Sequence, residues 1–292
     1  MQIICSSRSF NFIKQHIKND LINSFILSLE GFNLFSEYVY SYNELKTTIS
    51  YLKENNKQVI VDIAKLVHED EIKKLEEIIA KLNLLNVDYF MYSDFGVYYL
   101  LKKLGLVSKT MLYSNTYLTN TFDTKIYQEK NALVVLSNQI NTSELINISN
   151  NSYPNQVISA FGRALIMYTR RPLLTNYFKY RGSSLIPNRN NYALQEEFRE
   201  DLYPIIENEH STKIYDYGYY HLEEELKHMN QSANIIVSGE LLSNVDYSKV
   251  LSFYTNILKG NEKENILDLN IKLNKGAYSR KLTLLKGGAS NE

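Results

Sequence analysis

The stretch YPNQVISAFGRALIMYTRRPLLT, at Tyr153–Thr175, decides the fold of this chain. Its apolar, aromatic and β-branched residues predict a strand at 156–161, behind the turn-forming Pro154. Gly162 is expected to end that strand, because a glycine inside a strand pattern is typical of a bend. The guanidinium of Arg163 would then lie where the carboxyl end of the strand opens into a loop.

Two further arginines, Arg170 and Arg171, follow in the same stretch. Ligands of α/β barrels and open sheets bind at the carboxyl ends of the parallel strands. We therefore expect Arg163, Arg170 and Arg171 to converge at this end and to bind a carboxylate or a phosphate. The alternative is that Gly162 is a tight corner and that the arginines are solvated and pair with surface acids. The local pattern alone favours this alternative.

Outward from this stretch, short apolar strands alternate with amphipathic helices, which predicts a parallel sheet with helical crossovers. Seven or eight such units within roughly 250 residues favour an α/β fold with a TIM-like (β/α) barrel, closed or incomplete. The predicted barrel strands are 2–5, 24–29, 58–63, 87–92, 111–113, 132–136, 156–161 and 235–238. One domain is expected, with strands one to seven in 1–175, an insertion in 176–232, and the last strand, a helix and a tail in 233–292. Antiparallel strands are expected within the insertion at 192–198, 203–207 and 212–215, and a strand that packs back is expected in the tail at 267–285.

The composition narrows the classes of partner. The 292 residues hold 32 Lys and Arg against 32 Asp and Glu, so no net field attracts a nucleic acid or an anionic membrane, and RNA contact would need a local patch. Cys5 is the single cysteine, which excludes a disulfide framework or an all-cysteine metal site built by this chain alone. No apolar run reaches membrane-spanning length, and the expected location is the cytoplasm.

Short motifs recur along the chain in a characteristic order. They are Phe35–Ser36 with Glu44–Leu45, Ser93–Val97, Ser114–Asn120, Ser137–Asn141 with Glu144–Leu145, Phe161–Arg163 with Pro172–Leu173, and Gly276–Tyr278. This order resembles the peptidase U32 family, whose members include RNA-hydroxylation and paired ubiquinone-hydroxylation proteins. The short length is similar to that of the small member of the paired bacterial tRNA-hydroxylation proteins.

The chain departs from the family pattern at three places. The family's glutamate before the "H/Y-G" element is replaced by the neutral residues Gln156–Ile158, and its "S-x-E" acid by Gln139. Arg171–Pro172 stands where the family signature has a cysteine. The resemblance therefore implies a site that prefers an anion, with no iron–sulfur cluster and no metal bound by this chain alone.

Neutral and acidic side chains also lie at predicted strand ends. Ser114, Asn120 and Ser137, together with Gln139, supply hydrogen bonds that suit a polar organic ligand. Asp62, within an apolar strand, needs a partner or a shifted pKa, although an acid at a strand end that accepts backbone hydrogen bonds is the slightly favoured alternative. Asp94 is either a ligand-binding acid or the cap of the following helix. With Arg163, Arg170, Arg171 and Gly162, these residues form the predicted ligand-binding set.

The function that the resemblance implies is support of tRNA wobble-uridine hydroxylation to 5-hydroxyuridine. A longer, cluster-bearing U32 paralogue would be the partner, and tRNA a further one. The ligand would be a small dicarboxylate, since the relatives that hydroxylate tRNA depend on prephenate, or an RNA phosphate. The alternatives are a non-catalytic binding or scaffold subunit and a U32-type peptidase. The sequence has no H-E-x-x-H or G-x-S-x-G motif, so no catalytic residue is assigned.

Overall fold

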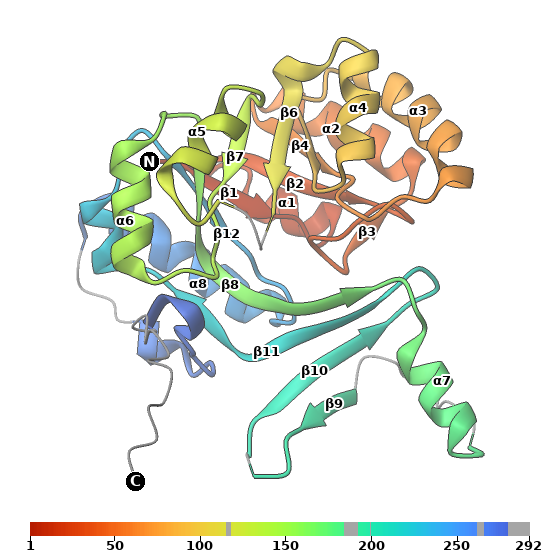
Figure 1. The fold of residues 1–292 in the computed structure, drawn as a ribbon. Helices are drawn as coiled ribbons and strands as arrows, with labels where there is room; N and C mark the ends of the chain where they lie inside the picture. Colours follow the sequence, from red (N-terminus) through yellow and green to blue (C-terminus); the bar gives the residue numbers. More distant parts are fainter. Residues whose placement is uncertain (115–117, 184–191, 199, 262–265, 280–292) are drawn as a thin grey trace, which may run out of the picture.

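The computed structural model describes residues 1–114, 118–183, 192–198, 200–261 and 266–279. Eight parallel strands form a ring in which each is hydrogen-bonded to its neighbours. The last barrel strand pairs with both the first and the seventh barrel strand, which closes the ring. The sheet is therefore a closed barrel, with helices between its strands (Figure 1). This confirms the predicted parallel barrel.

The barrel strands are, in order of pairing, β12 (Asn234–Val237), β1 (Ile3–Ser6), β2 (Ile22–Leu29), β4 (Gln58–Asp62), β5 (Tyr89–Tyr92), β6 (Thr110–Tyr113), β7 (Leu133–Val135) and β8 (Gln156–Thr169). Their side chains alternate between the inside and the outside of the barrel, and both directions are buried. The inner layer holds Ile4, Ile26, Ile60, Met91, Met111, Val135, Val157 and Ile236. Burial on both sides explains why these strands read as continuous apolar runs in the sequence.

The helices pack on the outside of the barrel through their apolar faces. They are α1 (Phe10–His16), α2 (Tyr42–Glu54), α3 (Glu69–Asn83), α4 (Phe95–Lys103), α5 (Thr121–Gln128), α6 (Thr142–Asn151) and α8 (Asn244–Leu258). The remaining helix, α7 (Leu173–Tyr180), follows the far end of β8 and is not part of this outer layer (Figure 1). Most begin with a side chain that accepts a hydrogen bond from the first turn. These capping residues are Ser9, Ser41, Asp94, Asn120, Asn141 and Ser243.

Strand β8 does not end at Gly162, contrary to the expectation. It continues to Thr169, and its second half pairs antiparallel with β11 (Thr212–His221). Gly162 is required by close packing rather than by a bend, because a Cβ at this position would lie 2.7 Å from the Tyr220 hydroxyl and 3.3 Å from Ser238 Cβ. Arg163 is consequently inside a strand.

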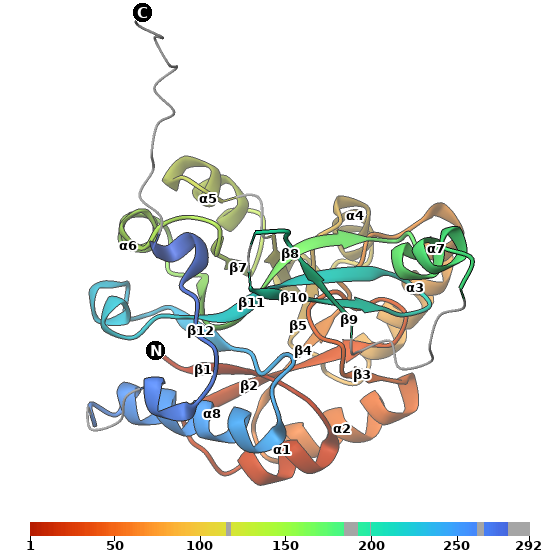
Figure 2. The same cartoon turned by 90° about the horizontal axis from the view of Figure 1, so that it is seen from below.

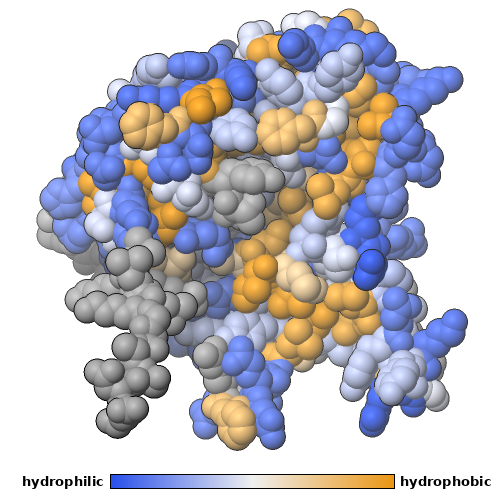
Figure 3. Space-filling view, viewed as in Figure 1, coloured by the Kyte–Doolittle hydropathy of each residue, from blue (hydrophilic) through white to orange (hydrophobic). Residues whose placement is uncertain are grey.

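An antiparallel sheet, which we call the arm, extends from the barrel as the predicted insertion before the last strand. It consists of the second half of β8 with β11, β10 (Leu202–Glu207) and β9 (Tyr192–Gln195). The arm lies across the carboxyl ends of the barrel strands (Figures 1 and 2). Apolar side chains gather where it faces the barrel (Figure 3), and Leu165 and Tyr168 of β8 pack against the inner core.

The remaining elements are short. Strand β3 (Val39–Tyr40) pairs with β2, and 3₁₀ turns occupy Val107–Lys109, Glu224–His228, Ile266–Leu269 and Gly276–Ser279. A strand was expected in the tail at 267–285, but the described part of the tail has the last two of these turns and one bridge, Tyr219–Leu273; positions 280–285 lie outside the described residues. No helix among the described residues has the length and apolar character needed to cross a bilayer.

Candidate functional site

The carboxyl ends of the barrel strands converge beneath the arm and bring charged side chains together. Arg8 follows β1 and Glu37 follows β2, while Glu240 follows β12. Arg163 comes from β8, and Lys213 and Tyr219 from β11. We call these six residues the mouth cluster.

The segment after β2 is held over the barrel mouth by a buried acid. Asp62, at the end of β4, accepts hydrogen bonds from the Ser28 hydroxyl at 2.7 Å and from the backbone N–H groups of Leu34, Phe35 and Ala64 at 2.9–3.3 Å. Burial raises the pKa of Asp62, and these hydrogen bonds oppose that shift. Asp62 is thus a strand-end residue that positions the Leu34–Phe35 backbone, which was the alternative reading of its sequence.

An ion pair beneath this segment is almost wholly buried. The Lys213 ammonium lies 2.7 Å from a Glu37 carboxylate oxygen, and the exposed fractions of the two side chains are 1% and 16%. Lys213 also donates to the Leu34 carbonyl at 2.9 Å, and the Tyr215 hydroxyl donates to Glu37 at 3.3 Å. Lys213 thereby ties the arm to the loop that covers the barrel.

Glu240 lies next to this pair and is only 3% exposed. One of its carboxyl oxygens accepts the Glu37 backbone N–H at 3.3 Å, whereas Oε2 is buried and has no hydrogen-bond partner among the described residues. Burial, followed by the nearby Glu37 carboxylate, raises the pKa of Glu240 to about 7. This carboxyl group therefore changes its charge near neutral pH.

Two arginines lie near Glu240, and the guanidinium group of each stacks over a tyrosine ring. The Arg8 guanidinium lies 4.2 Å from the centre of the Tyr38 ring, and that of Arg163 lies 4.4 Å from the centre of the Tyr219 ring. The Tyr219 hydroxyl donates to the Glu240 backbone carbonyl at 2.9 Å. In the described part of the chain, Nε and Nη1 of Arg8 and Nε of Arg163 are buried without a hydrogen-bond partner. Unsatisfied buried donors of this kind are rare in folded proteins and suit an oxyanion.

The space enclosed at this place is small. A cavity of about 10 Å³ is lined by Arg163, Glu240 and Ser238 together with apolar side chains that include Phe35 and Leu165. That volume is room for about one water molecule or one oxygen atom of a ligand. A larger ligand needs the covering loop or the arm to shift outward.

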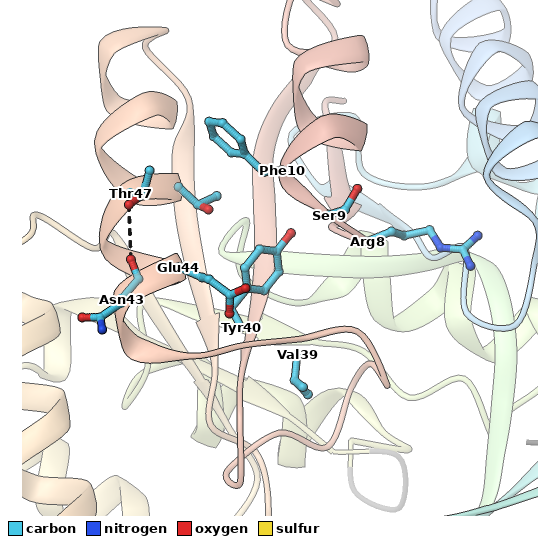
Figure 4. A pocket seen from close by; sticks show the side chains of 9 residues that line it. Arg8, Ser9, Phe10, Val39, Tyr40, Asn43, Glu44 and Thr47 are labelled. Atoms are coloured by element: carbon cyan, nitrogen blue, oxygen red, sulfur yellow. Dashed lines mark hydrogen bonds between the residues drawn. The ribbon is translucent and has the colours of Figure 1, made fainter. Parts of the chain in front are cut away.

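Two larger hollows lie near the mouth cluster, and Arg8 lines the first of them. One, of about 480 Å³, opens between the first turns of α1 and α2, where the Arg8 side chain points away from the labelled side chains of α2 (Figure 4). The other, of about 660 Å³, lies beside the arm and is lined by Gln139 and by the acids Glu196, Asp201 and Asp216. These carboxylates make the second hollow unsuitable for phosphate.

The three predicted arginines do not converge. Arg163 lies within β8 and Arg170 directly follows that strand, about 23 Å away along its axis at the usual rise per residue. Both terminal nitrogens of Arg170 bind Glu71, at 2.6 and 3.2 Å, and its Nη1 also approaches the Leu66 carbonyl at 3.4 Å. Arg171 is exposed. Arg163 alone of the three belongs to the mouth cluster, so the convergence of the three was wrong.

The other predicted residues have mainly structural surroundings. Asp94 caps α4 and also accepts the Val67 N–H at 3.1 Å, and the exposed Asn120 caps α5. Ser114 is buried at the end of β6. Ser137 is buried after β7, and its hydroxyl accepts the Gln139 N–H at 3.1 Å.

The sequence interpretation missed Arg8, Glu37, Lys213 and Glu240. Arg8 and Glu240 stand directly behind the first and last barrel strands, in the motifs CSSR and VSGE. The strand-end rule that selected Ser114 and Ser137 would have found these two. Lys213 and Glu37 carry no such signal, because their partners are distant in sequence.

The donor set does not fit an iron–sulfur cluster or a structural metal. Cys5 is buried, its sulfur lies 3.2 Å from the Tyr247 hydroxyl, and burial raises the pKa of its thiol to about 12. A thiol that keeps its proton is a poor metal ligand. Within the described ranges, no three His, Cys, Asp or Glu side chains are grouped to hold a metal ion.

Comparison with known proteins places this architecture in a family. The model of peptidase family U32 matches residues 22–283. The tRNA hydroxylation protein P2 of Bacillus subtilis is 23% identical over 196 residues, which cover 65% of this chain and 63% of that protein. An uncharacterized protease of Methanocaldococcus jannaschii, MJ0090, is 29% identical over 172 residues, which cover 56% of this chain and 42% of that protein. The chain thus spans less than two thirds of either relative.

A solved structure described as the U32 peptidase Mk0906 has the same fold. Its TM-score is 0.51 at 12% identity, and the match covers 82% of this chain and 92% of that one. At this identity the similarity concerns the fold alone.

Proposed function

The chain belongs to peptidase family U32, and from this premise we propose that it supports the hydroxylation of a tRNA wobble uridine together with a longer family member that carries the iron–sulfur cluster. The similarity to tRNA hydroxylation protein P2 supports this choice over peptide hydrolysis. The single cysteine supports the division of labour, because a cluster held by cysteine thiolates must be supplied by another chain.

The role that we assign to this chain is to bind a small dicarboxylate at the mouth cluster. The observation that carries it is the pair of arginines, Arg8 and Arg163, whose buried N–H donors have no partner among the described residues. Charge-assisted hydrogen bonds from a guanidinium to a carboxylate contribute about 1.5–3 kcal/mol each. Prephenate is the dicarboxylate to test first. Arg170 and Arg171 no longer belong to the proposed ligand set.

An RNA phosphate is the alternative ligand, and the salt dependence of binding separates it from a small dicarboxylate. Contacts along an RNA backbone lose affinity steeply as the salt concentration rises, whereas one enclosed small anion loses little. The enclosure of the arginines beneath the loop and the arm favours the small anion. A steep salt dependence of tRNA binding that disappears in Arg163→Met would favour the phosphate.

The function is tested by the tRNA itself. We expect deletion of the gene to remove 5-hydroxyuridine from bulk tRNA, measured by mass spectrometry of nucleosides, and the intact gene to restore it. Arg8→Met and Arg163→Met should restore little or none, whereas the exposed Arg171→Met is the matched control and should restore it fully. Unchanged 5-hydroxyuridine in the deletion strain would contradict the proposed function.

A non-catalytic binding subunit is the second candidate, and the small volume of the enclosed cavity favours it. This candidate requires 5-hydroxyuridine to depend on the presence of the protein but not on Arg8 or Arg163. Full restoration by both arginine variants, with normal amounts of folded protein, would therefore select it.

A further inference from the structure

Glu240 is the acid of the mouth cluster that no cation holds in place. The Lys213 ammonium, at 2.7 Å from Glu37, is also bound to the Leu34 carbonyl, and the Tyr215 hydroxyl points to Glu37 as well. Glu37 therefore binds the ammonium and a hydroxyl group. Glu240 has hydrogen bonds from the Glu37 backbone N–H and the Ser36 hydroxyl, which lower its pKa in part. The ammonium near the two acids is therefore bound by Glu37, and in the described part of the structure Glu240 has no ion-pair partner.

The groups that face Glu240 leave its proton in place. Tyr219 and Tyr215 keep their own protons, because burial raises the pKa of Tyr219 to about 12 and raises that of Tyr215 well above its ordinary value. The arginines are charged at any relevant pH, yet no ion pair between either of them and Glu240 is present in the described part of the structure. The neutral carboxyl thus has a hydrogen to donate and no acceptor for it.

The balance of charges in the mouth cluster also favours a neutral Glu240. Lys213 and Glu37 compensate one another, so the uncompensated charges next to Glu240 are the two guanidinium groups. An ionised Glu240 would cancel one of them and would repel an anion. A neutral Glu240 leaves two positive charges, which match the two negative charges of a dicarboxylate.

We propose that Glu240 is the specificity-determining residue of the mouth cluster: as a neutral carboxylic acid, it donates a hydrogen bond from its unpartnered oxygen to an oxygen atom of the anion that Arg8 and Arg163 bind. The proposal rests on the proposed dicarboxylate ligand. The cavity beside Arg163 and Glu240 has room for about one such atom. The site therefore selects dicarboxylates that place an acceptor oxygen there and disfavours analogues with an ammonium or a methyl group at that place.

A first measurement asks whether the proton is present without any ligand. The full chain, labelled with ¹³C at the glutamate carboxyl carbons, is titrated by NMR, and Glu240→Gln assigns the missing signal. We expect one glutamate to titrate near pH 7, while exposed glutamates titrate at about pH 4.3. The matched control is Glu30→Gln, at an exposed glutamate after β2, which should remove only an ordinary signal.

A second measurement asks whether binding needs the proton. Prephenate binding is measured by calorimetry at pH 6 and pH 8.5, in two buffers with different ionisation enthalpies. If only the protonated form binds, and the carboxyl titrates near 7, affinity falls about 30-fold over this range. At pH 8.5 the parent should take up about one proton per ligand. Glu240→Gln keeps a neutral donor, so it should bind with little pH dependence and without proton uptake.

The outcomes separate the inference from the proposed function. No glutamate titrating above pH 6, or equal pH dependence in the parent and Glu240→Gln, would overturn the role of Glu240. Absence of prephenate binding at both pH values would also overturn it, while loss of 5-hydroxyuridine on gene deletion would still support the proposed function. If Glu240→Gln does not fold, the proton uptake and pH profile of the parent decide, with Glu30→Gln as the reference.

Discussion

Replacement of Lys213 by methionine tests how strongly the buried ion pair fastens the arm to the barrel. The side chain is 1% exposed, and its ammonium binds Glu37 at 2.7 Å and the Leu34 carbonyl at 2.9 Å. Methionine has a similar volume, so the main loss is electrostatic. Removal of one partner from a buried pair leaves an uncompensated charge, which costs about 3–5 kcal/mol. The neighbouring Glu240 adds to that cost whenever it is ionised.

The assay is urea unfolding followed by circular dichroism, since the chain has no tryptophan. At pH 7.5 we expect Lys213→Met to lower the free energy of unfolding by about 3–5 kcal/mol. Burial raises the pKa of Glu240 to about 7 and Lys213 opposes that shift, so the loss should be larger at pH 7.5, where Glu240 is partly ionised, than at pH 5.5, where it is protonated. Glu37→Gln in the same chain should recover about 1–3 kcal/mol, because it removes the stranded charge.

The matched control is Lys275→Met, which breaks an ion pair of similar length in a more exposed place. Lys275 lies 2.6 Å from Glu225, and its side chain is 37% exposed. An exposed pair contributes about 0–1 kcal/mol, so this variant should lose little stability. Two results would refute the reasoning that the buried Lys213–Glu37 ion pair stabilises the contact between the arm and the barrel. One is an equal loss of unfolding free energy in Lys213→Met and Lys275→Met, and the other is a Lys213→Met loss that is the same at both pH values.

Three further outcomes are expected from the arm and its connection to the barrel. Gly162→Ala should lower the free energy of unfolding by about 1–3 kcal/mol, because the new Cβ would lie 2.7 Å from the Tyr220 hydroxyl; an unchanged urea midpoint would contradict the close packing. Arg170→Ala should cost roughly 1 kcal/mol through the loss of its bond to Glu71, whereas Arg171→Ala, at an exposed side chain, should change the midpoint by less than about 0.5 kcal/mol; a reversed order would be inconsistent with the structure. Hydrogen bonds from His68, Lys65 and Arg170 lower the pKa of Glu71 to about 2, although desolvation opposes this shift. The stabilising effect of the ionised Glu71 is therefore present above about pH 4.3 and is lost as the pH falls towards 2. Glu71→Gln should make the free energy of unfolding less dependent on pH in this range.

The barrel strands were predictable because each is buried on both faces. The sequence of a strand such as β4 is therefore a continuous apolar run without the alternating polar residues of a surface strand. The run is also too short for a helix. The arm was harder to predict. Its strand β11 was expected only at 212–215, but it continues to His221 through Asp216 and Gly218, residue types that are typical of turns. Gly162 misled the prediction, because a glycine that makes room for Tyr220 and a glycine that bends a strand have the same letter.

The site was less predictable than the fold for two physical reasons. The residue types that bind ligands also cap helices, and Asp94 and Asn120 act as caps. The partner of a charged residue is set by the tertiary structure, as for Arg170, which binds a glutamate 99 residues earlier in the chain. Arg8 and Glu240 could have been found, because strand ends next to charged residues are visible in the sequence alone.

The place where the family resemblance puts a cysteine is separate from the mouth cluster. That place, Arg171–Pro172, follows the far end of β8 and is exposed, whereas Arg163 lies near the barrel. At the usual rise per residue the two are about 26 Å apart along the strand. The loss of a thiol at one end of β8 therefore leaves the arginines and Glu240 at the other end intact. A chain with a single cysteine can therefore keep the proposed anion site in the barrel mouth, and the proposed division of labour with a cluster-bearing partner requires no further change in this fold.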